Sequence, residues 1–299
     1  MALDIRSAEQ MRNTITKAQQ RQIKKIYEEI AKEVAKMAKV YEGKTNISSV
    51  VRRHQLKIIA REVEKMLKPA GDEMKKIIVD SMNSISKEMA NCSVEWLKSV
   101  GWEVTNGFVS IQKSVVDDII TGRVYSNGWN LSKRIWGIND KVYQDVYSIV
   151  AKGIAEQKTT YEIAKDIEKY VSPNARKTWE WSKCYPGTNK VIDYNAQRLA
   201  RTLSQHAYQQ TFIRTTQNNP WVLKYQWEAN GSRVCPLCMN RNGNIYEKRE
   251  LPEDHPNGMC TWVPICESDD TIVNDIADWF SSPEGTYPEI DLFAKECGM

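Results

Sequence analysis

The sequence has no long apolar run, since nothing in its 299 residues approaches the roughly 18 uninterrupted apolar residues that a membrane-spanning helix needs. It contains only 14 Gly and 10 Pro, which excludes collagen-like and low-complexity chains. The first residues, MALDIRSAEQ, carry charges where a signal peptide has its apolar core. We therefore expect a soluble globular protein of roughly two domains, with no membrane contact, kept in a reducing compartment.

Signatures of catalysis are scarce as well. The chain has only three histidines, and it shows no P-loop, no GxGxxG and no Ser/His/Asp arrangement. Two of the histidines, His54 and His206, lie in predicted helices among polar neighbours, where a surface or packing role is expected. The carboxylates are scattered over helix faces without an isolated pair for acid–base chemistry. We expect a protein that is not an enzyme.

Charge is distributed unevenly although the net charge is only +4. Residues 1–70 hold 16 Lys and Arg against 8 Asp and Glu, whereas residues 261–299 hold 1 Lys against 9 Asp and Glu. A basic arm and an acidic tail are both able to contact charged partners, and either is also compatible with a solvated helix face.

The N-terminal region is predicted to be one helix after another. Apolar residues spaced by three and four over 23–41 predict an amphipathic helix that packs against other helices of the chain. A second helix is expected over 47–67, stopping near Pro69, and a third after Gly71. Cys92 lies on the apolar stripe of this third helix and is expected to be a core residue.

More helices are expected further along the chain. One covers 104–120 and ends at Gly122, and the next has Asn139 as its cap. Thr159-Thr160-Tyr161-Glu162 forms a capping box, and a long helix is expected over 192–216.

The period then changes from helix to strand. Large apolar and polar residues alternate over 221–228, a second short strand is expected over 260–265, and Ser268 is a helix start. The predicted fold is mostly α, a multi-helix N-terminal body with a small α+β zinc-binding C-terminal module. The expected domains are 1–139 (helical, with the basic arm at 1–70), 140–190 (a helical linker) and 191–299 (the C-terminal module with the acidic tail).

Four residues of this module, in the pattern C-x2-C-x16-H-x4-C, carry the chemistry: Cys235, Cys238, His255 and Cys260. Two thiolates and one imidazole, completed by a third thiolate, form the soft closed donor set that Zn²⁺ prefers, and four protein ligands leave no open position for water. We therefore predict a structural zinc site.

Alternatives remain for this cluster and for the other cysteines. The C-x-x-C could be a pair of reduced thiols, and Cys266 lies close enough to replace a ligand. Cys184 and Cys297 have no evident partner. The chain has ten Trp but only four Phe, and we expect most of the Trp side chains to anchor the core. The alternative is that six of them form a platform on which nucleic-acid bases stack: Trp96, Trp102, Trp129, Trp136, Trp179 and Trp181.

The module also holds, in chain order, an Arg-Thr pair in a helix, a Trp in a strand, an Arg-x-Cys-x-x-Cys, a glycine turn and a closing His-Pro-Asn and Cys: Arg201, Thr202, Trp227, Arg233, Cys235, Cys238, Gly243, His255, Pro256, Asn257 and Cys260. This order resembles the C-terminal domain of phage minor head proteins, the Mu F-like head morphogenesis proteins and their minor capsid relatives. The resemblance covers about residues 140–265. Ser232 stands where the family often has Asp, Gly258 replaces the first cysteine of the final motif, and Met259 replaces its Arg.

The resemblance implies a structural, low-copy protein of the virion, in the capsid interior or at the portal vertex, which resides in the host cytoplasm during assembly. It would act in head assembly and in genome packaging or delivery. The implied partners are the portal protein and the major capsid or scaffolding protein. The basic N-terminal region is a candidate contact for packaged DNA.

Three other interpretations stay open. Asp254-His255 beside a C-x-x-C also resembles a zinc-finger nuclease of the HNH type, although no histidine follows His255 to hold a catalytic metal. Related modules accompany toxin domains, but the first 190 residues show no catalytic constellation. A zinc-bearing nucleic-acid-binding protein of the host would need a basic patch around the cysteines, which the sequence lacks.

Overall fold

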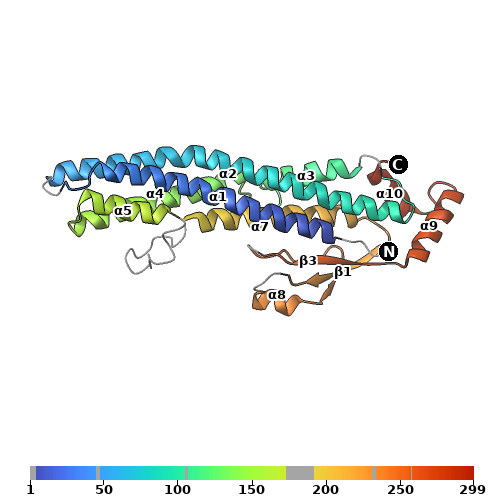
Figure 1. The fold of residues 1–299 in the computed structure, drawn as a ribbon. Helices are drawn as coiled ribbons and strands as arrows, with labels where there is room; N and C mark the ends of the chain where they lie inside the picture. Colours follow the sequence, from blue (N-terminus) through green and yellow to red (C-terminus); the bar gives the residue numbers. More distant parts are fainter. Residues whose placement is uncertain (1–4, 45–47, 105–106, 173–191, 231–233, 257) are drawn as a thin grey trace. The chain divides into compact units, whose positions relative to one another are not determined.

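The computed structural model describes residues 5–44, 48–104, 107–172, 192–230, 234–256 and 258–299 (Figure 1). The chain is mostly helical and has a small three-stranded antiparallel sheet near the C-terminus, so the predicted fold class is confirmed. None of the described helices is both long and apolar enough to cross a membrane. In chain order, the elements are α1 (Arg6–Lys39), α2 (Ser49–Ser99), α3 (Gly107–Thr121), α4 (Leu131–Ala155), α5 (Thr160–Val171), α7 (Ile192–Thr216), β1 (Val222–Glu228), α8 (Pro236–Arg241), β2 (Ile245–Tyr246), β3 (Thr261–Cys266), α9 (Asp269–Ser281) and α10 (Pro288–Cys297).

The chain divides into two compact units. The helical unit comprises residues 17–78 and 129–200, and the sheet-containing unit comprises residues 1–16, 79–128 and 201–299. The sheet-containing unit is therefore built from three separate stretches of sequence, and its first stretch is the start of α1.

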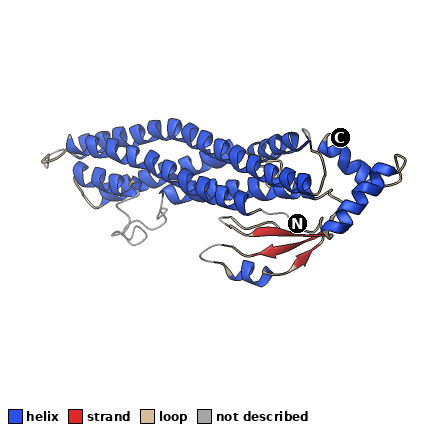
Figure 2. Cartoon of the chain, turned by 45° about the vertical axis from the view of Figure 1, so that its right-hand side comes forward, coloured by secondary structure: helices blue, strands red, loops and turns tan. Residues whose placement is uncertain are grey.

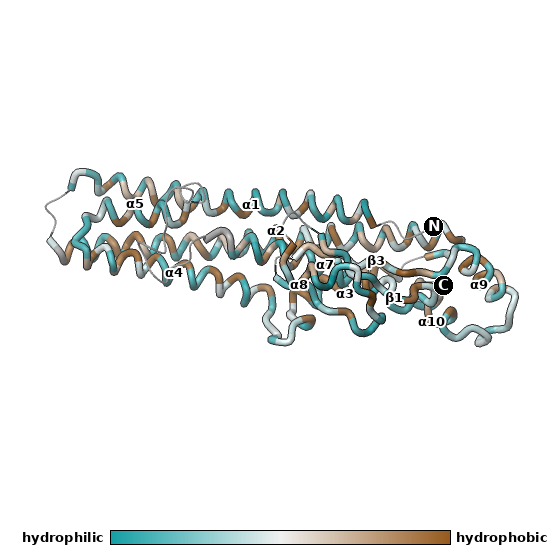
Figure 3. Tube along the Cα trace, turned by 90° about the horizontal axis from the view of Figure 1, so that it is seen from below, coloured by the Kyte–Doolittle hydropathy of each residue, from teal (hydrophilic) through white to brown (hydrophobic). Residues whose placement is uncertain are grey.

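Within the helical unit, buried residues follow the predicted spacing. Along α1, Ile23, Tyr27 and Val34 have no exposed surface, and Figure 3 shows apolar and polar residues alternating along the helices. The capping box that begins α5 is confirmed. The Thr159 side chain accepts from the Glu162 backbone, and the Glu162 carboxylate accepts from the Thr159 backbone at 2.7 Å.

The predicted interruption of the second helix at Pro69 is wrong, because α2 continues through this residue. A proline inside a helix removes one backbone donor and crowds the preceding turn. In the same turn the Leu67 carbonyl accepts a hydrogen bond from Asn139 Nδ2 at 2.8 Å. Gly71 leaves the space for this amide, since a Cβ atom there would lie 2.7 Å from Asn139 Nδ2. A contact from α4 thus supports the turn that contains the proline.

The same contact explains why the predicted capping role of Asn139 is wrong. The N-cap of α4 is Asn130, whose side chain accepts from the backbone N–H of Lys133. Asn139 lies two turns inside the helix and is 5% exposed, because its amide faces α2.

In the sheet-containing unit, β1 is the central strand and pairs antiparallel with β2 and β3 (Figure 2). A register shift between Val222 and Lys224 places Val222 and Tyr225 on the same buried side, although they are three positions apart in the sequence. The core continues across the strands through Trp227 and Trp262, whose ring centres are 4.8 Å apart and nearly perpendicular. α7 has the predicted bounds, and Phe212 on it packs edge-on against Tyr225.

The tryptophans divide between core and surface. Trp96 and Trp102 are buried, which confirms their predicted role as anchors, whereas Trp129 and Trp136 are 43% and 55% exposed. Trp179 and Trp181, like Cys184, lie outside the described residues.

Candidate metal centre

The C-x-x-C sequence forms the start of the short helix α8. Cys235 is the N-cap, Pro236 occupies the first helical position, and the Cys235 Sγ accepts from the Cys238 backbone N–H at 3.4 Å. This turn brings both sulfur atoms to one side of the chain. The backbone amide of Cys238 lowers the pKa of Cys235, whereas burial raises the pKa of Cys238, which is 1% exposed.

The imidazole of His255 faces Cys235. Its Nδ1 lies 3.0 Å from the Pro256 carbonyl, which can only accept, so Nδ1 carries the proton and donates. Its Nε2 lies 3.2 Å from Cys235 Sγ. A hydrogen bond that fixes one ring nitrogen and leaves the other facing the cluster is the usual arrangement of a histidine that binds a metal.

The ligand atoms form two groups that share Cys238. One group contains Cys235, Cys238 and His255, the other contains Cys238, Asp254 and Cys260, and within each group all ligand atoms lie within 4.8 Å of one another. Metal–ligand distances of about 2.0–2.3 Å place the ligand atoms of a tetrahedral site closer together than this, so a bound ion would require the two groups to draw together. The five residues form a cluster that could bind a metal ion.

All four predicted ligands lie in this cluster, and Asp254 is the member that the sequence analysis did not predict as a ligand. Its carboxylate is 5% exposed. Oδ1 accepts from the His255 backbone N–H at 2.8 Å, and Oδ2 accepts from the Cys260 backbone N–H at 3.2 Å and from Gln205 Nε2 at 3.3 Å. Burial raises the pKa of Asp254. Its position directly before His255 was the only signal in the sequence.

Among the described residues, Cys92, Cys266 and Cys297 belong to neither group of candidate ligands. Neither group of candidate ligands contains Cys266, which lies at the opposite end of β3 from Cys260, roughly 20 Å along an extended strand. Burial raises the pKa of Cys266 and of Cys297, each to about 11. Cys92 is buried, as predicted, and its Sγ lies 3.0 Å from Ser7 Oγ.

Further residues of the resemblance that lie in the described part of the chain include Arg201, Thr202, Trp227 and Gly243. Thr202 is buried on α7 beside the half-buried Arg201, and the Arg241 guanidinium lies over the Trp227 ring at 5.4 Å. Gly243 adopts a φ of 82° in the turn before β2, and its N–H donates to the Trp227 carbonyl at 2.8 Å. Arg233 and Asn257 lie outside the described residues.

Neither of the two other histidines belongs to a group of candidate ligands. His54 is exposed on α2, and His206 Nδ1 lies 3.0 Å from the Tyr125 hydroxyl.

Comparison with known proteins finds no relative of this chain. No family model matches the chain, and no curated protein or solved structure matches it.

Proposed function

We propose that this chain is a structural minor head protein of a tailed phage and that its C-terminal module holds a structural zinc ion. The observation that carries the proposal is the convergence of Cys235, Cys238, His255 and Cys260 on one cluster. These are the cysteine and histidine positions through which the sequence resembles the C-terminal domain of phage minor head proteins.

The donor chemistry supports zinc. Three sulfurs and one imidazole nitrogen suit a closed tetrahedral site, and Asp254 is already occupied by hydrogen bonds from His255, Cys260 and Gln205. Zinc, when bound, supplies a rigid cross-link between the α8 turn and the segment before β3. The chain's own residues prepare this cross-link: the α8 turn presents the two thiols, and the Pro256 carbonyl orients the imidazole.

The proposed partners are the portal protein and the major capsid or scaffolding protein, within the virion or the assembling head. Packaged DNA is a further candidate, through the basic region of residues 1–70. Cations in this region that face solvent include Lys25, Lys57 and Arg61, which are exposed on α1 and α2. If they contact phosphates, replacing all three by Gln will weaken DNA binding and reduce its dependence on salt concentration.

The proposal is tested on purified particles of a phage whose genome encodes this chain. Quantitative mass spectrometry of purified proheads and virions should find the chain at a small fraction of the copy number of the major capsid protein. Absence of the chain from both kinds of particle would overturn the proposal.

A nuclease assay with Mg²⁺ or Mn²⁺ separates the head protein from an enzyme of the HNH type. We expect no cleavage of double-stranded DNA, because His255 faces Cys235 within the cluster and no further histidine lies among the candidate ligands. Cleavage that is lost in His255→Ala would favour the nuclease.

A further inference from the structure

Arg12 is buried in the sheet-containing unit, where it is 2% exposed. Arginine is rarely buried to this extent unless its charge is matched by polar or aromatic partners. Nη1 donates to Gln205 Oε1 at 2.7 Å, Nη2 lies 4.0 Å from Glu9 Oε1, and the guanidinium lies 4.6 Å from the centre of the Tyr208 ring. These contacts replace the water that the Arg12 guanidinium would otherwise bind, and they tie the start of α1 to α7.

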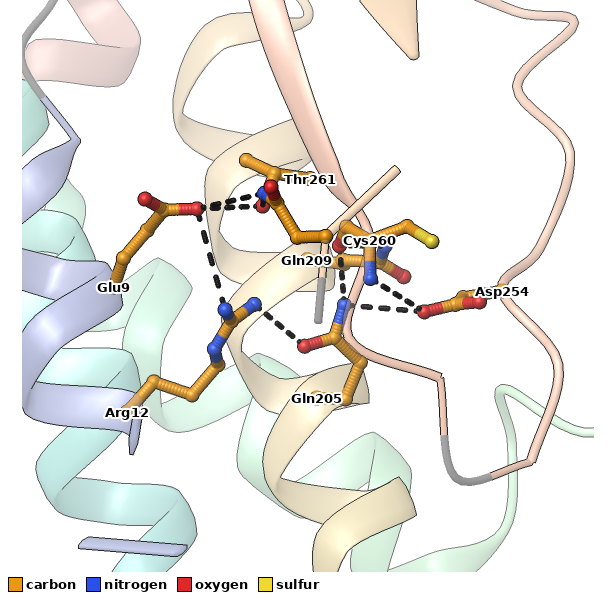
Figure 4. Close-up of polar contacts among 8 residues, drawn as sticks. Glu9, Arg12, Gln205, Gln209, Asp254, Cys260 and Thr261 are labelled. Atoms are coloured by element: carbon orange, nitrogen blue, oxygen red, sulfur yellow. Dashed lines mark hydrogen bonds and ion pairs between the residues drawn. The ribbon is translucent and has the colours of Figure 1, made fainter. Parts of the chain in front are cut away.

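Gln205 connects Arg12 to two residues of the metal centre, Asp254 and Cys260 (Figure 4). While its Oε1 accepts from Arg12, its Nε2 donates to the Cys260 carbonyl at 2.5 Å and to Asp254 Oδ2 at 3.3 Å. Gln209, one turn further along α7, donates to the same carbonyl at 3.0 Å. The backbone of one candidate ligand, Cys260, is therefore held by two side chains of α7.

Asp254 contacts two of the candidate ligands, His255 and Cys260, through their backbones. Its two oxygens accept the backbone N–H groups of His255 and Cys260, so one carboxylate sets the spacing of these two residues. The segment between β2 and β3 has no regular secondary structure among its described residues. Side-chain contacts must therefore hold the backbone there in place of a helix or sheet.

A second set of bonds joins the start of α1 to the same region. Glu9 Oε1 accepts from Thr261 Oγ1 at 2.6 Å and from Asn230 Nδ2 at 3.3 Å. Thr261 follows Cys260 directly, and Asn230 precedes the C-x-x-C segment. The first turns of α1 thus contact the chain on both sides of the cluster.

We propose that metal binding and the docking of residues 6–16 of α1 stabilise each other, with Asp254, Gln205 and Arg12 as positioning residues for the metal centre. The inference rests on the metal site of the proposed function, but not on the role in a phage head. Because binding free energies are linked reciprocally, a docked α1 segment must raise the affinity for zinc by the same factor by which bound zinc favours docking of the segment. Residues that hold metal ligands in this way commonly change metal affinity 10- to 100-fold, roughly, when they are replaced.

The test uses the full chain and measures its zinc affinity by competition with a chromophoric chelator. Arg12→Met keeps the length of the side chain but removes its donors, and we expect the zinc affinity to fall about tenfold or more. Arg12→Lys keeps a cation that can donate to Gln205 and should restore most of the affinity, which a loss of packing alone would not predict. Arg249→Met, the same substitution at an exposed position of this unit, should bind zinc with the wild-type affinity.

A second measurement needs no variant and remains informative if Arg12→Met fails to fold. Hydrogen exchange of the wild-type amides of residues 9–16 should accelerate about tenfold or more when zinc is removed, while exchange in α5 should not change. Unchanged exchange at 9–16, or a wild-type zinc affinity in Arg12→Met, would overturn the coupling and leave the metal site intact. A wild-type chain that binds no zinc would overturn the metal site and the coupling with it.

Discussion

The Asp254 carboxylate lies directly against the backbone of Gly258. A Cβ atom built at position 258 would come within 2.1 Å of Asp254 Oδ1 and 2.3 Å of its other carboxylate atoms. The Gly258 N–H donates to the His255 carbonyl at 2.8 Å, so the backbone there is fixed as well. Only glycine fits at this position while Asp254 holds His255 and Cys260.

This close approach predicts that Gly258→Ala is destabilising. The new methyl group must displace either Asp254 or the backbone beside Cys260, and we expect a loss of about 1–3 kcal/mol in the free energy of unfolding. Zinc affinity should fall in parallel, because Asp254 positions two candidate ligands. Urea unfolding and a chelator competition assay measure the two effects.

Gly137→Ala is the matched control for this substitution. A Cβ atom at Gly137 has no neighbour within 4 Å, and the residue lies exposed inside α4. It should leave zinc affinity unchanged and raise stability by about 0.5–1 kcal/mol. Equal effects of the two substitutions would contradict the role assigned to Gly258.

A buried pair of hydroxyl groups between α2 and α7 makes a second prediction. Ser86 Oγ and Thr211 Oγ1 are 2.6 Å apart and both residues are completely buried. Ser86→Ala and Thr211→Val should each cost about 1–2 kcal/mol, because each leaves one buried hydroxyl without its partner. The double substitution should cost less than the sum by about 1 kcal/mol, as measured by chemical unfolding in a double-mutant cycle.

Ser93 provides the control cycle, since its hydroxyl pairs with Thr215 at 2.8 Å instead. Ser93 lies seven residues, or about 10 Å, along α2 from Ser86. Ser93→Ala and Thr211→Val should therefore be additive within about 0.5 kcal/mol. A coupling as large as that of Ser86 with Thr211 would show that the effect is not specific to the bonded pair.

Asp118 on α3 makes stability dependent on pH. Partial burial by itself raises its pKa, but hydrogen bonds from Arg123 at 2.6 Å and Arg214 at 2.7 Å outweigh this effect, so the pKa is lowered. The folded protein therefore holds this carboxylate ionised at pH values where the unfolded chain, with a pKa of about 3.9, is already protonated. The stabilisation is present above the unfolded pKa and is lost as the pH falls through the folded pKa.

Asp118→Asn tests this dependence. We expect a destabilisation of less than about 1 kcal/mol at neutral pH, which should shrink as the pH is lowered from about 6 to 3. Urea midpoints of wild type and variant across this range give the measurement. Asp278→Asn, at an exposed position on α9, should show no such trend. A difference between wild type and Asp118→Asn that is the same at both ends of the range would contradict the assignment.

Features set by residues close together in the sequence could be predicted. The capping box of Thr159 and Glu162 depends on residues three apart, and the bounds of α7 follow from its apolar pattern. The spacing of Cys235, Cys238, His255 and Cys260 likewise indicated a metal site, because ligand pairs close in sequence need little chain geometry to meet.

Features set by distant contacts could not be predicted. Asn139 reaches the turn around Pro69 from 72 residues away, and Arg12 meets Gln205 from 193 residues away. A polar residue on a helix gives no local signal that its partner is buried beside it. The continuity of α2 and the contact of α1 with the metal centre therefore became visible only in the structure.

The most direct test of the metal centre is the zinc content of the full chain, purified under reducing conditions and measured by native mass spectrometry. Wild type should carry about one zinc ion per chain, as four ligands at one closed site require. The Cys235→Ser/Cys238→Ser double variant should carry none, whereas Cys266→Ser, outside the cluster, should retain the ion. A wild-type chain without zinc, or a double variant that keeps it, would contradict the assignment of these cysteines as ligands.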